Sequence, residues 1–322
     1  MNDTSLIIGT RGSELALCQT ELVEHGLAAK RPDVACERRI IRTLGDNRTD
    51  LPLPQVAGAS GTVDKGVFVA AIQEALISGE IDCAVHSLKD LPGQNDERLE
   101  IAATLPRADI HDVLVLKKGA DIDNLLLGTS SVRRAALVRA YWGATARTRD
   151  IRGNVPTRLR KLAEDSDLSG ILLAKAGLER LGYVDPEIEA DGVKLVCVDL
   201  PRDSFTPAVG QGTIAVQIRK GDDRTRIIVS CLDDPITHLC SRTEREFLRL
   251  LGADCSTPVG AYARVIKETI TFRVLHIGVD GVPRRVVARG PVSDPEGVAA
   301  LAIRLLQDFK ADYEHYLHSS GF

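Results

Sequence analysis

Short apolar runs that lead directly into helical patterns recur along the first part of the chain. Residues 5–10 (SLIIGT) are a β-rich run, and apolar residues at helical spacing follow in 14–29. The run at 125–131 (LLLGTSS) leads into a helical pattern in the same way, with serines that can cap the helix, as does the run that opens 170–182. This alternation predicts α/β lobes with mainly parallel sheets, and ligands bind such sheets at the carboxyl ends of their strands.

The pattern changes after about residue 232. Residues 239–253 have a helical pattern, residues 270–290 indicate a hairpin turned at an Asp-Gly pair, and residues 293–309 indicate a helix that opens with a cap and a proline. The sequence therefore predicts a small C-terminal α+β domain.

The composition argues against several classes of protein. The 322 residues are enough for two or three domains, and a net charge of −4 gives no general attraction to nucleic acid or to a membrane. The seven cysteines form no CxxC pair, the seven histidines are not spaced as a ligand set, and no apolar run reaches the roughly 20 residues that span a bilayer. Because the first residues also lack the features of a signal peptide, we expect a cytoplasmic protein with reduced thiols and no metal.

The segment 129–163 is strongly basic, with eight arginines and one lysine against a single acid, Asp150. One explanation is a basic surface helix whose long side chains cover apolar neighbours. A nucleic-acid site is another, but such sites usually add aromatic platforms or an overall basic charge. Arginine forks bind carboxylates and phosphates in pairs of hydrogen bonds, so the segment favours a small polyanion as ligand.

Lys89 and Asp90 follow a predicted buried strand in AVHSLKDLP. Adjacent opposite charges often mark only a solvated turn. At the carboxyl end of a parallel strand, however, a carboxylate faces the expected ligand crevice, where it can steady a positive charge or move a proton.

Cys255 lies in a loop of small and turn-forming residues, GADCSTPVGAY. The loop is too polar and irregular to belong to a core, which leaves a chance loop cysteine or a functional thiol as explanations.

Eight motifs occur together in one order: GTRGS, KGVF, AVHSLKDLP, GTSSVRR, RGNVPTRL, AGLERLG, PAVGQG and DCSTPVGAY. From about residue 5 to residue 265 the chain closely resembles the porphobilinogen deaminase (hydroxymethylbilane synthase) family. The resemblance implies a transferase of tetrapyrrole (haem) biosynthesis that joins four porphobilinogen molecules with loss of ammonia. The units are added to a covalently attached dipyrromethane, and water then releases hydroxymethylbilane.

The resemblance also implies roles for individual residues. Cys255 would carry the dipyrromethane cofactor through a thioether, and Asp90 would be catalytic, stabilising the azafulvenium cation that forms when ammonia leaves. The expected cofactor-binding residues are Cys255, Lys89, Asp90, Ser87, Thr129, Ser130, Ser131, Arg133, Arg134 and Arg152. The expected substrate-binding residues are Arg11, Ser13, Arg158, Arg180, Gln211, Lys65 and Phe68.

One loop departs from the family pattern. Members commonly have two lysines flanking glycines before the GVF-like helix, whereas here Gly61 takes the earlier position and Asp64 adds an acid. The substrate-binding roles of Lys65 and Phe68 therefore rest on a motif that only partly matches the family. We expect the loop before this helix to be mobile.

The implied lobes resemble those of periplasmic binding proteins, with the chain crossing back to the first lobe after PAVGQG. The expected domains are a first lobe of 1–105 with 213–231, a second lobe of 106–212, and a C-terminal domain of 232–322 that carries the cofactor cysteine. We expect a monomer that binds neither nucleic acid nor a membrane. The alternative is a non-catalytic two-lobe binding protein for a carboxylated small molecule, which would need neither Asp90 nor a modified Cys255.

Overall fold

The first strand runs into the first helix through a short turn, as the alternation predicts. Strand β1 covers Thr4–Thr10 and helix α1 covers Glu14–Lys30, and the Ser13 hydroxyl caps the helix by accepting a hydrogen bond from the Ala16 N–H at 3.4 Å. The computed structural model describes residues 4–41, 66–94, 96–252, 257–278 and 280–319.

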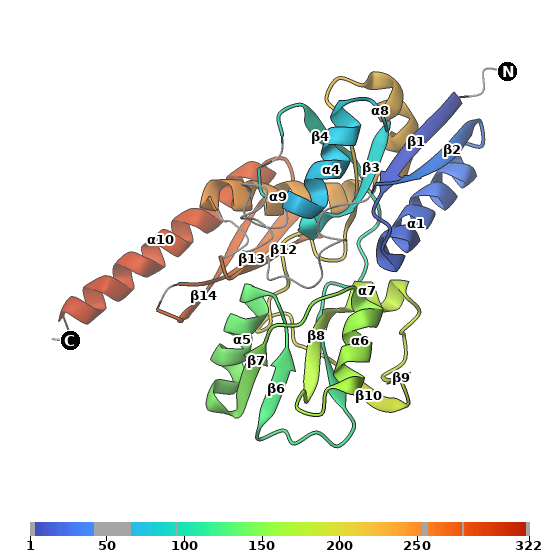
Figure 1. Cartoon of the computed structure of the whole chain (residues 1–322). Helices are drawn as coiled ribbons and strands as arrows, with labels where there is room; N and C mark the ends of the chain where they lie inside the picture. The colour runs from blue at the N-terminus through green and yellow to red at the C-terminus, as the bar shows by residue number, and fades with distance from the viewer. Residues whose placement is uncertain (1–3, 42–65, 95, 253–256, 279, 320–322) are drawn as a thin grey trace.

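The first lobe is built on a five-stranded sheet (Figure 1). Its further elements are β2 (Val34–Ile40), α4 (Gly66–Ile77), β3 (Cys83–Ser87), the 3-10 turn η1 (Leu88–Asp90), β4 (Leu99–Thr104), β11 (Ile214–Arg219), α8 (Asp223–Val229) and η3 (Ser230–Leu232). Val23 and Leu27 of α1 pack on one face of the sheet, and Ile72 and Leu76 of α4 pack on the other. The sheet is thus covered on both faces and its apolar residues are buried.

The second lobe contains a six-stranded sheet in the order β7-β6-β8-β5-β10-β9. Its elements are β5 (Asp112–Lys117), β6 (Leu125–Gly128), α5 (Val132–Trp142), η2 (Gly143–Thr145), β7 (Ala146–Arg149), α6 (Val155–Glu164), β8 (Gly170–Ala174), α7 (Lys175–Arg180), β9 (Glu187–Ala190) and β10 (Val193–Asp199). Leu137 of α5 packs on one face, and Leu159 of α6 packs on the other. Two α/β lobes are therefore confirmed.

Mainly parallel sheets were expected. The strands toward one edge of each sheet are parallel, as expected, but those toward the other edge are antiparallel. The first sheet has the order β2-β1-β3-β11-β4, with β1 parallel to β2 and β3, but β11 is antiparallel to both of its neighbours. In the second sheet, β5 is antiparallel to β8 and β10, and β9 is antiparallel to β10. β5 and β11 each follow a passage between the lobes, so each enters its sheet from the opposite end.

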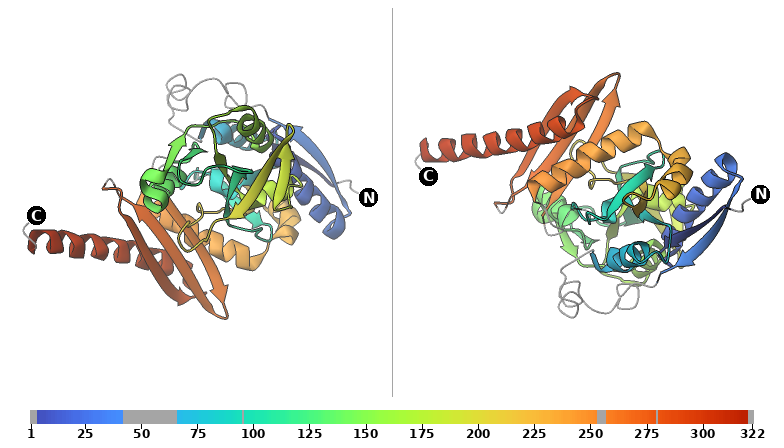
Figure 2. Two further views of the ribbon diagram at one scale, coloured as in Figure 1. Left: turned by 90° about the horizontal axis from the view of Figure 1, so that it is seen from below. Right: turned by 90° about the horizontal axis from the view of Figure 1, so that it is seen from above.

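The C-terminal domain joins a three-stranded antiparallel sheet to two helices. Its elements are α9 (Pro235–Leu251), β12 (Val259–Ile266), β13 (Thr269–Ile277), β14 (Pro283–Pro291) and α10 (Pro295–Ser319). α9 begins earlier than predicted because the Asp234 carboxylate caps it, and α10 runs beyond its predicted end and projects past the sheet (Figures 1 and 2). The domain boundaries themselves stay a prediction.

Two faces of β13 serve two different cores. Phe272 packs with Phe247 of α9 inside the C-terminal domain. Leu275 and Ile277 instead pack with Phe205 in a cluster that belongs to the second lobe. The C-terminal domain therefore completes part of the second lobe's core.

The two segments that cross between the lobes bind each other. Gln211 donates from Nε2 to the Ile110 carbonyl at 2.9 Å, and the Ala108 N–H donates to the Gly212 carbonyl at 3.2 Å. Gly212 has a φ of +87°, and a Cβ there would lie 2.6 Å from the Ala108 carbonyl oxygen, so only glycine fits. The lobes are thus joined by a paired strap of two chain segments.

Glu244 of α9 attaches the C-terminal domain to this strap. Its carboxylate is fully buried and binds Arg107 from the first crossing at 2.5 Å. It also accepts hydrogen bonds from the Gly210 N–H at 2.7 Å and the Ala263 N–H of β12 at 2.8 Å. Three parts of the molecule therefore meet at one carboxylate.

Gly260 of β12 offers a test of this attachment. A Cβ at this position would lie 2.6 Å from the Thr206 carbonyl oxygen and 2.8 Å from that of Pro207. We expect Gly260→Ala to lower the free energy of unfolding by about 1–3 kcal/mol, because β12 must move away from the second crossing. Urea unfolding at equilibrium measures the change.

Gly177→Ala is the matched control. A Cβ at Gly177 in α7 has its closest neighbour at 3.6 Å, an ordinary contact. Since alanine favours the helix, we expect this variant to be unchanged or more stable by up to about 1 kcal/mol. Equal stability changes in the two variants would contradict the close-contact argument.

Candidate active site

The carboxyl end of β3 brings several predicted residues to a small pocket between the lobes. Ser87 ends the strand and shares hydrogen bonds with Gln19 of α1, whose Nε2 lies 2.8 Å from the Ser87 Oγ. Lys89 follows in η1, and its Nζ lies 3.5 Å from the Gln211 Oε1. The pocket is lined by Leu15, Gln19, Ser87, Lys89, Ala174, Ala176, Gly177, Arg180, Gly210, Gly212 and Thr213.

Arg158 and Arg180 are partly buried cations that face little negative charge. Arg158 of α6 donates from Nε to the Gly153 carbonyl at 2.8 Å, and Arg180 of α7 donates to the Gly212 carbonyl at 2.7 Å. Burial lowers the pKa of each guanidinium to about 10. Among the described residues neither arginine has a carboxylate within ion-pair distance. A carboxylated ligand would therefore be bound favourably beside them.

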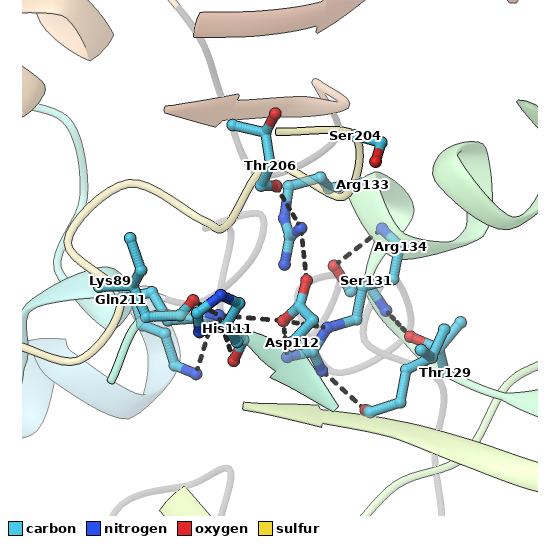
Figure 3. A network of polar contacts seen from close by, with 12 residues as sticks. Lys89, His111, Asp112, Thr129, Ser131, Arg133, Arg134, Ser204, Thr206 and Gln211 are labelled. Carbon is cyan, nitrogen blue, oxygen red and sulfur yellow. Dashed lines mark hydrogen bonds and ion pairs between the residues drawn. The ribbon is translucent and has the colours of Figure 1, made fainter. Parts of the chain in front are cut away.

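Arg133 and Arg134 already have a carboxylate partner inside the protein (Figure 3). Both side chains are buried, and each binds Asp112 of β5 at 2.7 Å. Burial alone would raise the pKa of the Asp112 carboxyl, but the two guanidinium groups outweigh this and hold it far below the usual range. Sequence reasoning missed Asp112, although an acid at the start of the apolar run DVLVLK was a signal.

The hydroxyls of the GTSS motif shape the turn before α5. Ser131 caps the helix by accepting a hydrogen bond from the Arg134 N–H at 3.4 Å, and the Thr129 Oγ1 accepts one from the Ser131 N–H at 3.2 Å. Ser130 donates to the Ile151 carbonyl at 2.5 Å. These bonds give the hydroxyls a structural role in addition to the predicted contacts with the cofactor.

The other predicted residues are spread around the same region or lie outside the described part of the chain. Arg152 is partly exposed and pairs with Asp150 at 3.2 Å. Gln211 is buried and binds the strap, as described above. Arg11 lies between β1 and α1, next to the cap residue Ser13. Cys255, Lys65 and the Phe68 side chain lie outside the described residues, so their predicted roles stay predictions.

His86 lies beneath this site and was also missed by the sequence reasoning. It is buried in β3, four residues before Asp90, and its Nε2 has no hydrogen-bond partner. Burial lowers the pKa of His86 to about 4, although the Asp90 charge acts in the opposite direction. His86 is therefore neutral at physiological pH.

Two absences concern the described residues only. Within them, no group of three His, Cys, Asp or Glu side chains is arranged to hold a metal ion. The same part of the chain contains no helix that is both long enough and apolar enough to cross a membrane.

Two family models match the chain. One is described as "Porphobilinogen deaminase, dipyromethane cofactor binding domain" and matches residues 6–227, and the other, "Porphobilinogen deaminase, C-terminal domain", matches residues 238–310. The chain belongs to the porphobilinogen deaminase family. The resemblance found in the sequence is confirmed, and the alternative of a non-catalytic binding protein is not favoured.

Individual relatives cover most of the chain. The porphobilinogen deaminase of Roseiflexus castenholzii is 40% identical over 307 residues, covering 94% of this chain and 96% of the relative. That of Syntrophobacter fumaroxidans is 38% identical over 292 residues, covering 87% of each chain.

Solved structures show much weaker likeness. The BenM effector binding domain with benzoate is 14% identical with a TM-score of 0.42, covering 77% of this chain and 94% of that one. Substrate binding domain 2 of Lactococcus lactis GlnP, in an open conformation, is 10% identical with a TM-score of 0.38, covering 78% of this chain and 92% of that one. These likenesses have no bearing on function.

The titration of His86 predicts how stability in this family member changes with pH. The histidine pKa is about 4 in the folded chain and 6.5 when unfolded, so the unfolded chain binds more protons between these values. Stability is therefore full above pH 6.5 and falls toward pH 4, by about 3 kcal/mol from this group alone.

His86→Leu should flatten this part of the stability curve, because leucine does not titrate. Urea unfolding of wild type and variant at several pH values from 4 to 7 measures the difference. If the two curves run parallel, the buried neutral histidine does not cause the acid sensitivity.

Proposed function

We propose that the chain is a transferase with hydroxymethylbilane synthase activity, which joins four porphobilinogen units with loss of ammonia and then releases the linear tetrapyrrole by hydrolysis. The observation that carries the proposal is the pair of partly buried cations, Arg158 and Arg180, neither of which has a carboxylate within ion-pair distance among the described residues. Porphobilinogen bears an acetate and a propionate, so it supplies the missing anions. Membership of the family supports the same reaction.

The residues present fit a dipyrromethane cofactor. Arg133 has a buried Nε without a hydrogen-bond partner, and a cofactor carboxylate would satisfy this donor. Lys89, Arg152 and the hydroxyl of Thr129 would add further contacts, and Cys255 would hold the cofactor through a thioether. When bound, the cofactor supplies the pyrrole carbon to which the first substrate unit is joined.

Asp90 would act on the substrate. The pyrrole becomes positively charged as ammonia leaves, and an ionised carboxylate next to the ring stabilises that charge. The same carboxylate would take up the proton that the attacking pyrrole later sheds. Asp90 lies near enough to Arg158 to influence its pKa, which supports giving the two residues roles in one site.

The substrate contacts divide between the two lobes. Arg11 and Ser13 come from the first lobe, whereas Arg158 and Arg180 come from the second. Gln211 lies on the segment between them, and Lys65 and Phe68 precede or open α4. We further propose that the protein acts as a monomer in the cytoplasm.

Intact mass spectrometry tests the attachment of the cofactor. We expect the purified chain to exceed its calculated mass by one dipyrromethane unit and Cys255→Ser to lack this excess, because serine offers no thiol for the thioether. Cys36→Ser removes an exposed cysteine and should keep the adduct. An adduct that survives in Cys255→Ser, or an active wild-type chain without one, would show the assignment to be wrong.

Asp90→Asn tests the catalytic role. Asparagine is nearly isosteric but has no negative charge, so we expect ammonia release per cofactor-loaded enzyme to fall at least ~100-fold. Asp90→Glu keeps the charge at a shifted position and should retain part of the activity. Near-normal turnover in the loaded asparagine variant would return Asp90 to the simpler role of a charged turn.

A further inference from the structure

Asp112 occupies the point where the first crossing segment enters the second lobe. It is the first residue of β5, and its side chain is fully buried. No role in the site was expected for it from the sequence. Its contacts nevertheless reach several residues to which the proposed function gives roles.

Four donor groups converge on this one carboxylate (Figure 3). Arg133 donates from Nη1 at 2.7 Å, and Arg134 donates from Nη2 at 2.7 Å and from Nε at 3.1 Å. Gln211 donates from Nε2 at 3.0 Å. Hydrogen bonds of this kind are strong and directional, so the carboxylate fixes the orientation of all three side chains.

The remaining bonds of the two arginines differ. Arg134 uses its Nη1 to donate to the Leu172 carbonyl at 2.8 Å, so each of its nitrogens binds the protein. Arg133 uses Nη1 a second time, to donate to the Thr206 carbonyl at 2.7 Å, while its buried Nε has no partner. The bonds of Arg133 to Asp112 and Thr206 are therefore both made by Nη1, and Nε is left as a donor for a further acceptor.

The charges in this cluster do not cancel. Two guanidinium groups and one carboxylate leave one positive charge in a buried position. Burial lowers the pKa of Arg133, and Asp112 offsets only part of this effect. An additional anion would lower the energy of the cluster, and the unused Arg133 Nε is a donor that can receive it.

Gln211 extends the network to the first lobe. Its Nε2 binds Asp112, while its Oε1 lies 3.5 Å from the Lys89 Nζ. One amide thus links a buried carboxylate of the second lobe to a cation beside Asp90. Asp112 is therefore connected both to the two arginines of α5 and, through Gln211, to Lys89, which lines the pocket.

We propose that Asp112 is a positioning residue for the reaction: it orients Arg133 and Arg134 directly, and Lys89 through Gln211, so that cations of both lobes meet the carboxylates of one ligand. The proposal rests on the proposed function, because the ligand is taken to be a carboxylated pyrrole. Asp112 itself does not contact the ligand.

Asp112→Asn tests the proposal, since it keeps the shape of the side chain and removes its charge. We expect apoprotein exposed to porphobilinogen to acquire the dipyrromethane mass at least ~10-fold more slowly than wild type. In the loaded enzyme we expect KM for porphobilinogen to rise at least ~10-fold, with a smaller change in kcat, because misdirected cations weaken binding first. Asp112→Glu restores the charge and should recover part of both losses.

Asp82→Asn is the matched control. Asp82 is a partly buried carboxylate, which accepts a hydrogen bond from the Ile7 N–H at 2.7 Å and pairs with Arg219 at 3.7 Å. It precedes β3, at the opposite end of that strand from Lys89. We expect Asp82→Asn to lower the melting temperature while cofactor loading and KM stay at wild-type values.

Loss of the buried charge can also prevent folding, because two arginines would be left uncompensated. In that case Gln211→Met decides: it keeps the ion pairs of Asp112 with the two arginines and removes the amide that links Asp112 to Lys89, together with the bonds of that amide to the Ile110 and His111 carbonyls. KM should again rise. The proposal is overturned if Asp112→Asn folds and keeps cofactor loading and KM within twofold of wild type. It is also overturned if Asp82→Asn loses loading and KM to the same extent, or if KM is unchanged in Gln211→Met. A wild-type chain that neither loads nor turns over porphobilinogen would instead overturn the proposed function.

Discussion

The buried carboxylate of Glu244 is the contact on which the arrangement of the whole molecule depends. It binds Arg107 on the first crossing segment, the Gly210 N–H on the second, and the Ala263 N–H on β12. A buried ion pair that loses one partner leaves an uncompensated charge, which is strongly destabilising. Glu244 therefore ties both crossings between the lobes to β12, the strand that follows the Cys255 loop.

Several arginines of the second lobe are buried or partly buried although the chain as a whole is weakly acidic, with a net charge of −4. The protein satisfies only some of these cations itself. Asp112 serves Arg133 and Arg134, whereas Arg158 and Arg180 have carbonyl partners alone among the described residues. Because a carbonyl cannot neutralise a guanidinium, these two arginines favour a ligand with carboxylates over a neutral one of the same shape.

The sequence predicted those parts of the structure that depend on local pattern. The turn from β1 to α1, the cap at Ser131 and the hairpin of β13 and β14 follow from residues that are neighbours in the chain. The placement of β11 between β3 and β4 did not follow, because its partners are distant in sequence and its apolar run fits either direction. The Asp112–Gln211 contact spans 99 residues, so no local pattern announced it. The roles proposed for Asp90 and Cys255 come from the family motifs, because a chemical role leaves little trace in periodicity.

The shared face of β13 has a consequence for how the protein is divided. One family model ends at residue 227 and the other begins at residue 238, as they would for two separable units. Leu275 and Ile277, however, lie beyond that boundary and pack with Phe205 in the core of the second lobe. A chain that stopped at the boundary would expose this apolar cluster to water. The boundary thus separates two segments that family models describe separately, whereas the hydrophobic core includes residues from both. The domain that carries Cys255 therefore cannot be exchanged without repacking the lobe that supplies the arginines.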